Sequence, residues 1–449
     1  MTQVSAPEKG STYNDLCAAI EKKTAVAGII GLGYVGLPLA EHLCRAGYRV
    51  IGFDIDETKV TQLAAGKSYI KHIDPGWIAD SVKQGNFEAT TDFSRLAEAD
   101  CISICVPTPL SEHNEPDLRF VEETTAAVAR TLRPGQLIIL ESTTYPGTTA
   151  EVMQPMLEAA GLSVGKDFFL VYSPEREDPG NAAFNMQAIP KVLGGVTERC
   201  REVGAAFYGH SFDRVIEVSS PAAAEMTKLL ENIFRAVNIA LVNELKVLCD
   251  RMGIDVWEVI EAAGTKPFGF MRFYPGPGLG GHCIPIDPFY LSWKAKEYDL
   301  PTRFIELAGE INTRMPQYVI TRLMEALNER GLPLKGSRVL VLGLAYKKDI
   351  DDTRESPSLR LIELLLQHGA EVSYHDPFWP TFPSTRKYHF SPPFLEVTPE
   401  NLEAVDCVLI STAHSEYDYE AIVRHAPLVL DTRNATATVS GGRGNIVKA

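Results

Sequence analysis

Short apolar runs alternate with helical stretches through the first half of the chain. The apolar runs predict strands at residues 26–30, 49–53, 101–106, 137–141 and 168–172. Helical spacing predicts helices at residues 11–23, 36–46 and 120–132. Alternation of this kind predicts an α/β fold built on a doubly wound parallel sheet.

The pattern changes after residue 219, where Ser220-Pro221 supplies a cap residue followed by proline at the first helical position. Apolar residues then recur at helical spacing through residues 222–252 without glycine or proline, and Gly253 ends the run. A helix well above the usual dozen residues suits a spine between domains or a dimer interface.

A second α/β pattern begins near residue 335. Strands are predicted at residues 338–343, 371–374, 407–411 and 428–430, with a helix at residues 358–368. The strand–turn–helix order of the first region returns here without its glycine pattern. The Ser-, Gly- and Thr-rich residues from 434 onward are expected to be frayed.

Composition and charge narrow the functional class. Hydrophobic residues make up 45% and charged residues 22% of the 449 residues, as in ordinary globular proteins, and the length predicts two or three domains. The net charge of −15 argues against nucleic acid or an anionic membrane as the main partner. The start has no signal-peptide pattern and no apolar run is long enough to span a membrane. With eight scattered cysteines, these features predict a cytoplasmic chain with reduced thiols.

A glycine-rich turn follows the first predicted strand. Gly31, Gly33 and Gly36 would allow a tight turn, a close approach of the backbone to pyrophosphate, and packing of the next helix on the strand. Asp54 ends the second strand, where its carboxylate can accept both ribose hydroxyls and would repel a 2′-phosphate. The strand context and the acidic residue together predict an NAD site.

Cys283 lies in a glycine-rich loop that ends at Asp287. A thiol nucleophile in a chain that binds a nicotinamide favours oxidation of an alcohol past the aldehyde to an acid, through a covalent thiohemiacetal. No second cysteine or histidine pair lies at ligand spacing, so no metal site is expected. The other cysteines are expected to be small core residues: Cys17, Cys44, Cys101, Cys105, Cys200, Cys249 and Cys407.

Two pairs of polar residues could either be solvated at the surface or take part in ligand binding. Lys228 and Asn232 are one turn apart on the long helix and share a face. Such a pair is usually solvated, but this one lies at the end of the helix that leads back to the dinucleotide-binding region. Lys347 and Arg354 follow a strand end, where they could hold phosphates of a second nucleotide or form a solvated basic turn.

Seven segments occur in the order of one enzyme family: GLGYVGLPLA, VPTP, ESTTYPGTT, YSPERE, EMTKLLENIFRAVNIALVNE, GPGLGGHCIPIDP and YKKDIDDTRESPS. Over residues 25–435 the chain resembles the UDP-glucose/GDP-mannose dehydrogenase family. The resemblance implies two Rossmann-like domains joined by a long central helix that forms a homodimer, with NAD on the first domain and a UDP-sugar between the domains. The implied divisions are a leader helix at 1–24, an NAD-binding domain at 25–218, a helical dimerisation domain with the cysteine loop at 219–330, and a UDP-sugar-binding domain at 331–440.

The resemblance also implies roles for single residues. Cys283 would form the thiohemiacetal and then the thioester, with Lys228 and Asn232 stabilising the oxyanion. Asp287 would orient or activate water, and Glu175 would act in thioester hydrolysis. Thr143 would lie near the nicotinamide and the reacting carbon and complete the implied catalytic set. The implied cofactor contacts are Gly31, Gly33, Tyr34, Val35, Gly36, Asp54, Pro107, Thr108, Thr143 and Arg354. The implied substrate contacts are Arg176, Lys228, Asn232, Gly280, Tyr346, Lys347 and Arg433.

One position departs from the UDP-glucose branch of the family. That branch usually has lysine directly before the aspartate of the cysteine loop, and this chain has Ile286. The forms GGHCIPIDPFYL and SPERE are similar to the UDP-N-acetylhexosamine branch. Within it, ESTTYPGTT and ENIFRAVNIALVNE most resemble the UDP-N-acetylglucosamine 6-dehydrogenases of bacterial surface-polysaccharide (O-antigen) synthesis. The resemblance therefore implies NAD-dependent four-electron oxidation of the C6 hydroxyl of UDP-N-acetylglucosamine.

Three alternatives remain open. UDP-N-acetylgalactosamine and UDP-N-acetylmannosamine are epimers that a single sequence does not distinguish. A β-hydroxyacid dehydrogenase would share the first domain and the long helix, but it would need neither Cys283 nor the second α/β region. A non-catalytic nucleotide-sugar-binding protein would have no need of Cys283, Lys228 or Asp287.

Overall fold

The structure, a computed structural model, describes residues 11–70, 73–111, 115–176, 186–281, 284, 286–385 and 387–449. The chain divides into two compact units. The first unit comprises Met1–Glu231 and Trp293–Asp299, and the second comprises Asn232–Ser292 and Leu300–Ala449. The long helix α8 (Pro221–Met252) begins in the first unit and continues in the second.

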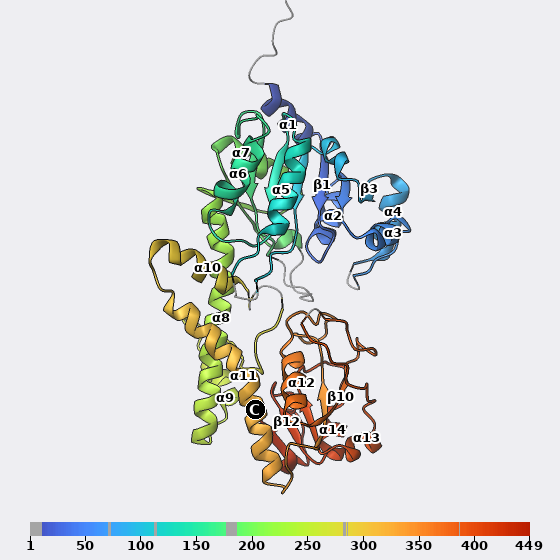
Figure 1. The fold of residues 1–449 in the computed structure, drawn as a ribbon, viewed down its shortest axis with the longest axis vertical. Helices are drawn as coiled ribbons and strands as arrows, with labels where there is room; N and C mark the ends of the chain where they lie inside the picture. Colours follow the sequence, from blue (N-terminus) through green and yellow to red (C-terminus); the bar gives the residue numbers. More distant parts are fainter. Residues whose placement is uncertain are drawn as a thin grey trace, which may run out of the picture. The chain divides into compact units, whose positions relative to one another are not determined.

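The first unit contains an eight-stranded sheet with the strand order β3-β2-β1-β4-β5-β6-β7-β8 (Figure 1). The strands are β1 (Val26–Ile30), β2 (Arg49–Phe53), β3 (Phe87–Thr90), β4 (Cys101–Ile104), β5 (Leu137–Leu140), β6 (Phe169–Tyr172), β7 (Lys191–Gly195) and β8 (Val215–Val218). The helices are α1 (Ser11–Glu21), α2 (Gly36–Arg45), α3 (Glu57–Ala64), α4 (Pro75–Gln84), η1 (Phe93–Glu98), α5 (Arg119–Thr131), η2 (Thr148–Met153), α6 (Gln154–Glu158), η3 (Met186–Ala188), α7 (Glu198–Gly209) and η4 (Lys296–Tyr298). The predicted doubly wound sheet is confirmed, but β7 pairs antiparallel with β6, so β7 and β8 run opposite to the others.

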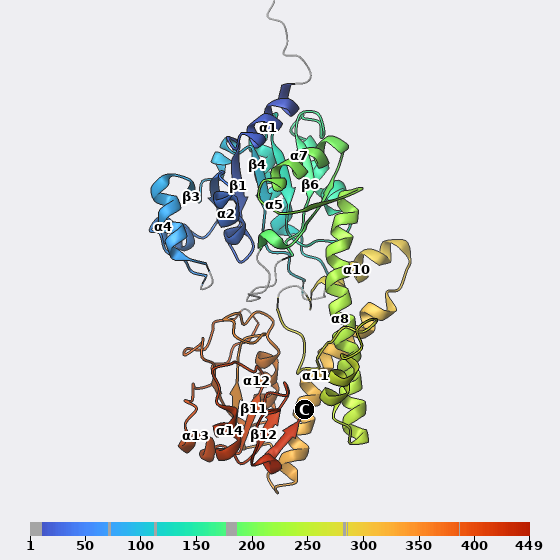
Figure 2. The same ribbon diagram turned by 180° about the vertical axis from the view of Figure 1, so that it is seen from behind.

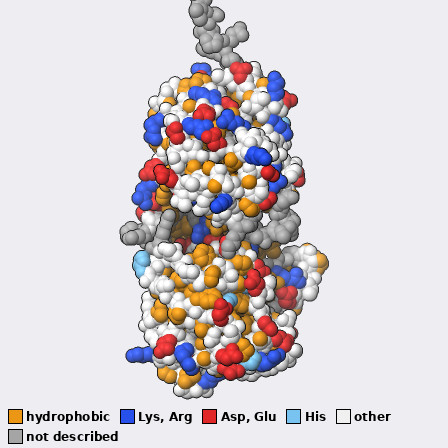
Figure 3. Space-filling view, turned by 90° about the vertical axis from the view of Figure 1, so that its right-hand side faces the viewer, with side chains coloured by type: hydrophobic (Ala, Val, Ile, Leu, Met, Phe, Trp, Pro, Cys, Tyr) orange, Lys and Arg blue, Asp and Glu red, His pale blue; other side chains and the backbone are white. Residues whose placement is uncertain are grey.

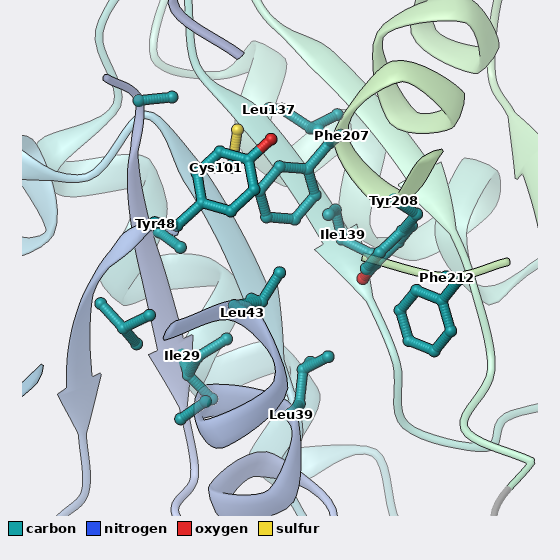
Figure 4. Close-up of a cluster of buried hydrophobic side chains, with 14 of the residues drawn as sticks. Ile29, Leu39, Leu43, Tyr48, Cys101, Leu137, Ile139, Phe207, Tyr208 and Phe212 are labelled. Carbon is teal, nitrogen blue, oxygen red and sulfur yellow. The ribbon is translucent and has the colours of Figure 1, made fainter. Parts of the chain in front are cut away.

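Each face of this sheet has its own apolar core, because successive side chains of a strand point to opposite sides. On one face, Ile29 of β1 packs with α1, α2 and α7. Figure 4 shows Leu43 of α2 and Phe207 of α7 over this face. On the other face, Ile30 of β1 packs with α5 and α6. Two neighbouring residues of one strand thus serve opposite layers, as a doubly wound fold requires.

The second unit contains a parallel five-stranded sheet with the order β10-β9-β11-β12-β13 (Figure 2). The strands are β9 (Arg338–Leu342), β10 (Glu371–His375), β11 (Cys407–Ile410), β12 (Val429–Asp431) and β13 (Ile446–Lys448). The helices are the second part of α8, α9 (Val256–Ala263), α10 (Asp287–Ala295, which crosses into the first unit at Trp293), α11 (Arg303–Asn328), α12 (Pro357–Gln367), α13 (Pro399–Ala404), α14 (Tyr419–His425) and η5 (Arg443–Asn445). Helices α11 and α12 cover one face of the sheet, and α13 and α14 cover the other.

The expectation that the residues from 434 onward are frayed is wrong. Residues 446–448 form β13, which pairs in parallel with β12, and the amide of Ala449 donates to the carbonyl oxygen of Asp431 at 3.0 Å. A strand of three residues is too short to show a period of its own, and its partner strand supplies the order. The strands β3, β7 and β8 are also absent from the predicted set, although β7 is as long as β1 and β2.

The surface carries charges of both signs. On the face shown in Figure 3, Lys and Arg side chains are interspersed with Asp and Glu. None of the helices in the described ranges is long and apolar enough to cross a bilayer.

Candidate active site

The turn between β1 and α2 has the geometry that a dinucleotide phosphate requires. Gly31 has φ +90°, and a Cβ there would lie 2.5 Å from the carbonyl oxygen of Cys105. A Cβ on Gly36 would lie 1.9 Å from the carbonyl oxygen of Gly31. A Cβ on Gly33, in contrast, would meet no protein atom within 4 Å. The fold therefore has no room for a side chain at Gly31 or Gly36. At Gly33 the absence of a side chain instead leaves open space beside the start of α2, where an NAD pyrophosphate is expected to bind.

Asp54 is fixed beside this turn at the carboxyl end of β2. Its Oδ2 accepts a hydrogen bond from the amide of Leu32 at 2.9 Å and forms an ion pair with Lys59 Nζ at 3.1 Å. Its Oδ1 accepts from the amide of Asp56 at 3.0 Å. The side chain is buried. A carboxylate held in this way lies where the ribose acceptor of a Rossmann-like site is expected.

The other predicted cofactor positions of the first unit follow neighbouring strands. Tyr34 and Val35 lie in the glycine turn after β1, Pro107 and Thr108 follow β4, and Thr143 follows β5. Since β1, β4 and β5 are adjacent and parallel, these positions lie along one edge of the sheet. Thr108 is buried, Thr143 is partly buried and Pro107 is exposed.

Glu225 on α8 holds the loop that follows Thr143, a role that the sequence pattern did not reveal. Its carboxylate accepts from the amide of Gly147 at 2.6 Å, from the amide of Thr149 at 2.9 Å and from the hydroxyl of Thr149 at 2.7 Å. The side chain is fully buried, and burial raises the pKa of Glu225. A glutamate on a long helix is usually solvated, so no local signal marked it.

Lys228 and Glu175 meet within the first unit. The Lys228 Nζ donates to the backbone carbonyl oxygen of Glu175 at 2.6 Å, and only 8% of Lys228 is exposed. The next residue, Arg176, donates from Nη2 to Glu231 at 2.5 Å and from Nη1 to the carbonyl oxygen of Pro190 at 2.7 Å. Lys228 is therefore not a solvated surface lysine, and Arg176 joins α8 to the segment before β7.

A buried ion pair lies behind Glu175, and the sequence analysis missed it. Lys191 at the start of β7 donates to Glu141 at 2.6 Å, and the exposed fractions of the two side chains are 3% and 0%. Tyr208 donates its hydroxyl to the same Glu141 carboxylate. Burial raises the pKa of Glu141, and the nearby Lys191 ammonium opposes that shift. Glu141 was assigned to a strand end, and Lys191 lies in a strand that was not predicted, so nothing in the pattern joined them.

Asn232 and Asp287 meet within the second unit. The Asn232 Nδ2 donates to Asp287 Oδ2 at 2.5 Å, and both side chains are buried. Asp287 is the first residue of α10, where the helix dipole favours a negative charge. Cys283 itself lies outside the described residues, together with its neighbour His282 and with Pro285. Asn232 is therefore buried rather than solvated, and it holds the carboxylate that follows the cysteine loop.

Glycines of the cysteine loop allow close contact with two predicted substrate residues. A Cβ on Gly280 would lie 2.5 Å from the Cβ of Tyr346, and a Cβ on Gly276 would lie 2.5 Å from the Arg433 guanidinium. The Arg433 Nε donates to the carbonyl oxygen of Ser411 at 2.9 Å, and burial lowers the pKa of Arg433 to about 10. No carboxylate in the described part of the chain forms an ion pair with this guanidinium. Its charge is therefore suited to binding an anionic ligand.

Two further predicted basic residues lie in the turn after β9. Lys347 is partly buried, and Arg354 forms a two-pronged ion pair with Asp352, at 2.6 Å for the shortest contact. The turn is fixed by Asp376 at the end of β10, whose Oδ2 accepts from two backbone amides of the turn and from His414 at 3.2 Å. Arg354 is therefore paired within the second unit, and the turn around Lys347 is tied to the sheet.

The cysteines in the described ranges have the character of structural residues. Cys101, Cys200, Cys249 and Cys407 are buried, and the others are partly buried. Burial raises the pKa of Cys44 and of Cys407 to about 12. Such thiols are poor nucleophiles near neutral pH.

Comparison with known proteins agrees with this organisation. Models of the UDP-glucose/GDP-mannose dehydrogenase family match the chain in three parts: the NAD binding domain at residues 25–212, the central domain at 222–314 and the UDP binding domain at 340–438. The chain is 36% identical over 412 residues to Protein CapL of Staphylococcus aureus, with 90% of this chain and 95% of CapL covered. It is 34% identical to the UDP-N-acetyl-D-glucosamine 6-dehydrogenase of Pseudomonas aeruginosa, with 88% and 92% covered.

A solved structure extends the likeness to the fold. The UDP-D-ManNAc dehydrogenase of Pyrococcus horikoshii matches with a TM-score of 0.84 and 32% identity, and the match covers 94% of this chain and 98% of that one. The family model of the first domain and the geometry of the glycine turn agree on NAD as the cofactor. The family model of the third domain and the relatives agree on a UDP-sugar as the class of substrate. The chain therefore belongs to the UDP-glucose/GDP-mannose dehydrogenase family and is an NAD-dependent UDP-sugar 6-dehydrogenase.

Proposed function

We propose that this enzyme oxidises C6 of UDP-N-acetylglucosamine to the carboxylate, and that the product serves bacterial surface-polysaccharide synthesis, of which the O-antigen is one example. The observation that carries the proposal is that each unit holds buried polar groups suited to this chemistry. Lys228 meets Glu175 in the first unit, and Asn232 meets Asp287 in the second. Ile286 in place of the lysine of the UDP-glucose branch supports an N-acetylated sugar.

Bound NAD⁺ supplies the hydride acceptor for each of the two oxidations at C6. In the proposed mechanism, water held by Asp287 takes the proton of the C6 hydroxyl in the first oxidation. The Cys283 thiolate then attacks the aldehyde carbon, so that the aldehyde is held as a thiohemiacetal until the second oxidation yields the thioester. Lys228 and Asn232 stabilise the oxyanion at each tetrahedral stage.

Release of the product requires water. In this proposal Glu175 accepts a proton as water attacks the thioester carbon, the C–S bond breaks and the Cys283 thiolate leaves. The overall reaction consumes one UDP-sugar, two NAD⁺ and one water, and it yields the uronic acid, two NADH and two protons. Thr143, at the carboxyl edge of the first sheet, would lie beside the nicotinamide.

A second sugar is favoured by a specific observation. The Pyrococcus horikoshii relative, which is 35% identical over 415 residues, is named a UDP-N-acetyl-D-mannosamine dehydrogenase. UDP-N-acetylmannosamine is therefore the second candidate substrate, with the same chemistry. The two epimers differ only in the orientation of the acetamido group at C2.

We further propose that the enzyme is a homodimer joined through the part of α8 in the second unit. Leu241, Leu248 and Met252 lie on this segment and are 54%, 53% and 61% exposed. Their spacing of seven and four residues places them on one side of the helix. An apolar stripe of this kind on a long helix is suited to a second copy of the same stripe.

The test is the yield of NADH from each UDP-sugar in turn: UDP-N-acetylglucosamine, UDP-N-acetylmannosamine, UDP-N-acetylgalactosamine and UDP-glucose. We expect about two NADH per UDP-N-acetylglucosamine and little from the others. Two NADH from a different sugar would keep the mechanism and replace the substrate. One NADH per sugar would refute the thioester mechanism.

A further inference from the structure

Lys191 is a buried cation that the proposed mechanism does not use. Its Nζ lies 2.6 Å from Glu141 Oε2, 3.3 Å from the carbonyl oxygen of Pro174 and 3.5 Å from Glu175 Oε2. The ammonium therefore contacts both the backbone just before Glu175 and the carboxylate of Glu175 itself. All of these groups belong to the first unit.

The surroundings of Lys191 leave it little freedom. Its Nζ lies 5.1 Å from the centre of the Tyr208 ring and 5.3 Å from that of Phe212, two side chains that Figure 4 shows in the apolar core. Tyr208 in turn donates its hydroxyl to Glu141. A lysine held by ion pairing on one side and by aromatic rings on the other is a fixed charge rather than a mobile one.

Several contacts hold Glu175 in place. Its carbonyl oxygen accepts from Lys228 at 2.6 Å, its Oε1 accepts from the amide of Arg176 at 2.7 Å, and its Oε2 faces Lys191. The side chain of Glu175 keeps 12% of its surface exposed, whereas Glu141 is fully buried. Of the two carboxylates that share Lys191, Glu175 is thus the one that can meet water.

We propose that Lys191 is a positioning residue that holds the Glu175 carboxylate ready for release of the acid from Cys283. This inference rests on the proposed function, in which Glu175 accepts the proton of the attacking water. In that step a C–O bond forms, the C–S bond breaks and the electron pair leaves with the thiolate, so no further oxidant or reductant is needed. Lys191 forms and breaks no covalent bond in this step. It holds in place the carboxylate that accepts the proton.

The test is Lys191→Met, which replaces the apolar stem of the lysine with an unbranched side chain of similar shape and removes the charged amino group. We expect a rapid burst of two NADH per active site, because both oxidations precede the slowed release, followed by steady-state turnover at least tenfold slower than that of the wild type. Mass spectrometry of the quenched variant should find the acyl adduct on Cys283. Glu175→Gln should show the same adduct.

A second variant separates this role from a purely structural one. Lys191→Met leaves Glu141 without its buried cation, so Lys191→Met/Glu141→Gln removes both charges and should restore thermal stability while turnover stays slow and the adduct persists. Lys246→Met is the matched control, because Lys246 is also a buried lysine paired with a carboxylate, Asp250 at 2.5 Å. It should change stability without accumulating the adduct.

Three results would overturn the proposal: wild-type turnover in folded Lys191→Met, recovery of wild-type turnover in the double variant, or loss of the NADH burst in both variants. Failure of the proposed function has a separate signature. In that case the wild type would yield one NADH per sugar, and Glu175→Gln would form no adduct.

Discussion

Gly33 and Gly36 lie in the same turn, but their replacement by alanine should affect different properties of the enzyme. At Gly33 a Cβ meets no protein atom within 4 Å, and the backbone is not in the left-handed region. Gly33→Ala should therefore leave folding intact or raise the free energy of unfolding by about 0.4–1 kcal/mol, because alanine restricts the unfolded chain. The same methyl group would occupy the space that the pyrophosphate needs.

The magnitude follows from the linkage between binding and stability. NAD⁺ at 100 times its Kd stabilises a protein by about 2.7 kcal/mol, and a tenfold weaker Kd reduces that gain to about 1.4 kcal/mol. We expect NAD⁺ to stabilise Gly33→Ala by at least about 1.3 kcal/mol less than it stabilises the wild type, which corresponds to an affinity at least about tenfold weaker. Urea unfolding with and without NAD⁺, together with direct titration of NAD⁺, measures both quantities.

Gly36→Ala provides the contrast. Its Cβ would lie 1.9 Å from the carbonyl oxygen of Gly31, so the helix must move and the apo protein should lose about 1–3 kcal/mol of stability. If Gly33→Ala bound NAD⁺ with wild-type affinity, the open space at Gly33 would not be the pyrophosphate site. If Gly33→Ala destabilised the apo protein as strongly as Gly36→Ala, the steric argument itself would be wrong.

Two further predictions concern buried carboxylates that organise loops of the site. Glu225→Ala removes the acceptor of three hydrogen bonds to Gly147 and Thr149 and should lower the free energy of unfolding by about 3–5 kcal/mol in urea titrations, since buried donors are left unpaired. A loss below about 1 kcal/mol would contradict this. For Asp376, burial opposes ionisation, but hydrogen bonds from His414 and from backbone amides hold its pKa below the usual value. Because the pKa is depressed in the folded state, its stabilisation is present above the unfolded value near about 4 and is lost as pH falls through the folded value. The stability advantage of the wild type over Asp376→Asn should therefore be constant from about pH 5 to 7 and shrink below about pH 4; an advantage that grew on acidification would refute the assignment.

Much of the fold could be predicted because the signals are local. The strand β1, the glycine turn and the helix α2 each follow from residues next to one another in sequence, and α8 begins and ends where Pro221 and Gly253 indicate. The reversed strand β7 and the three-residue strand β13 could not be predicted in this way. Their direction and pairing depend on partner strands distant in sequence.

The residues of the candidate site also differ in whether local sequence marks them. Residues with an unusual local setting, such as Asp54 after its strand, could be singled out from the sequence, and their roles stay predictions. Glu141, Lys191 and Glu225 were not found, because a buried charge looks like a solvated one until its partner is known. The sequence separation between Glu141 and Lys191 is 50 residues, and no pattern in a single chain joins them.

The short strand β13 also bears on how the protein avoids aggregation. Without it, β12 would be the edge of the second sheet and would present unpaired amides and carbonyls to any neighbouring chain. β13 covers that edge with only three residues, and its Lys448 is tied to Asp255 at the start of α9 by an ion pair of 2.7 Å. A brief, charged edge strand is a poor template for further pairing. A change that displaces residues 446–448 would thus expose the unpaired edge of β12 to pairing with another chain.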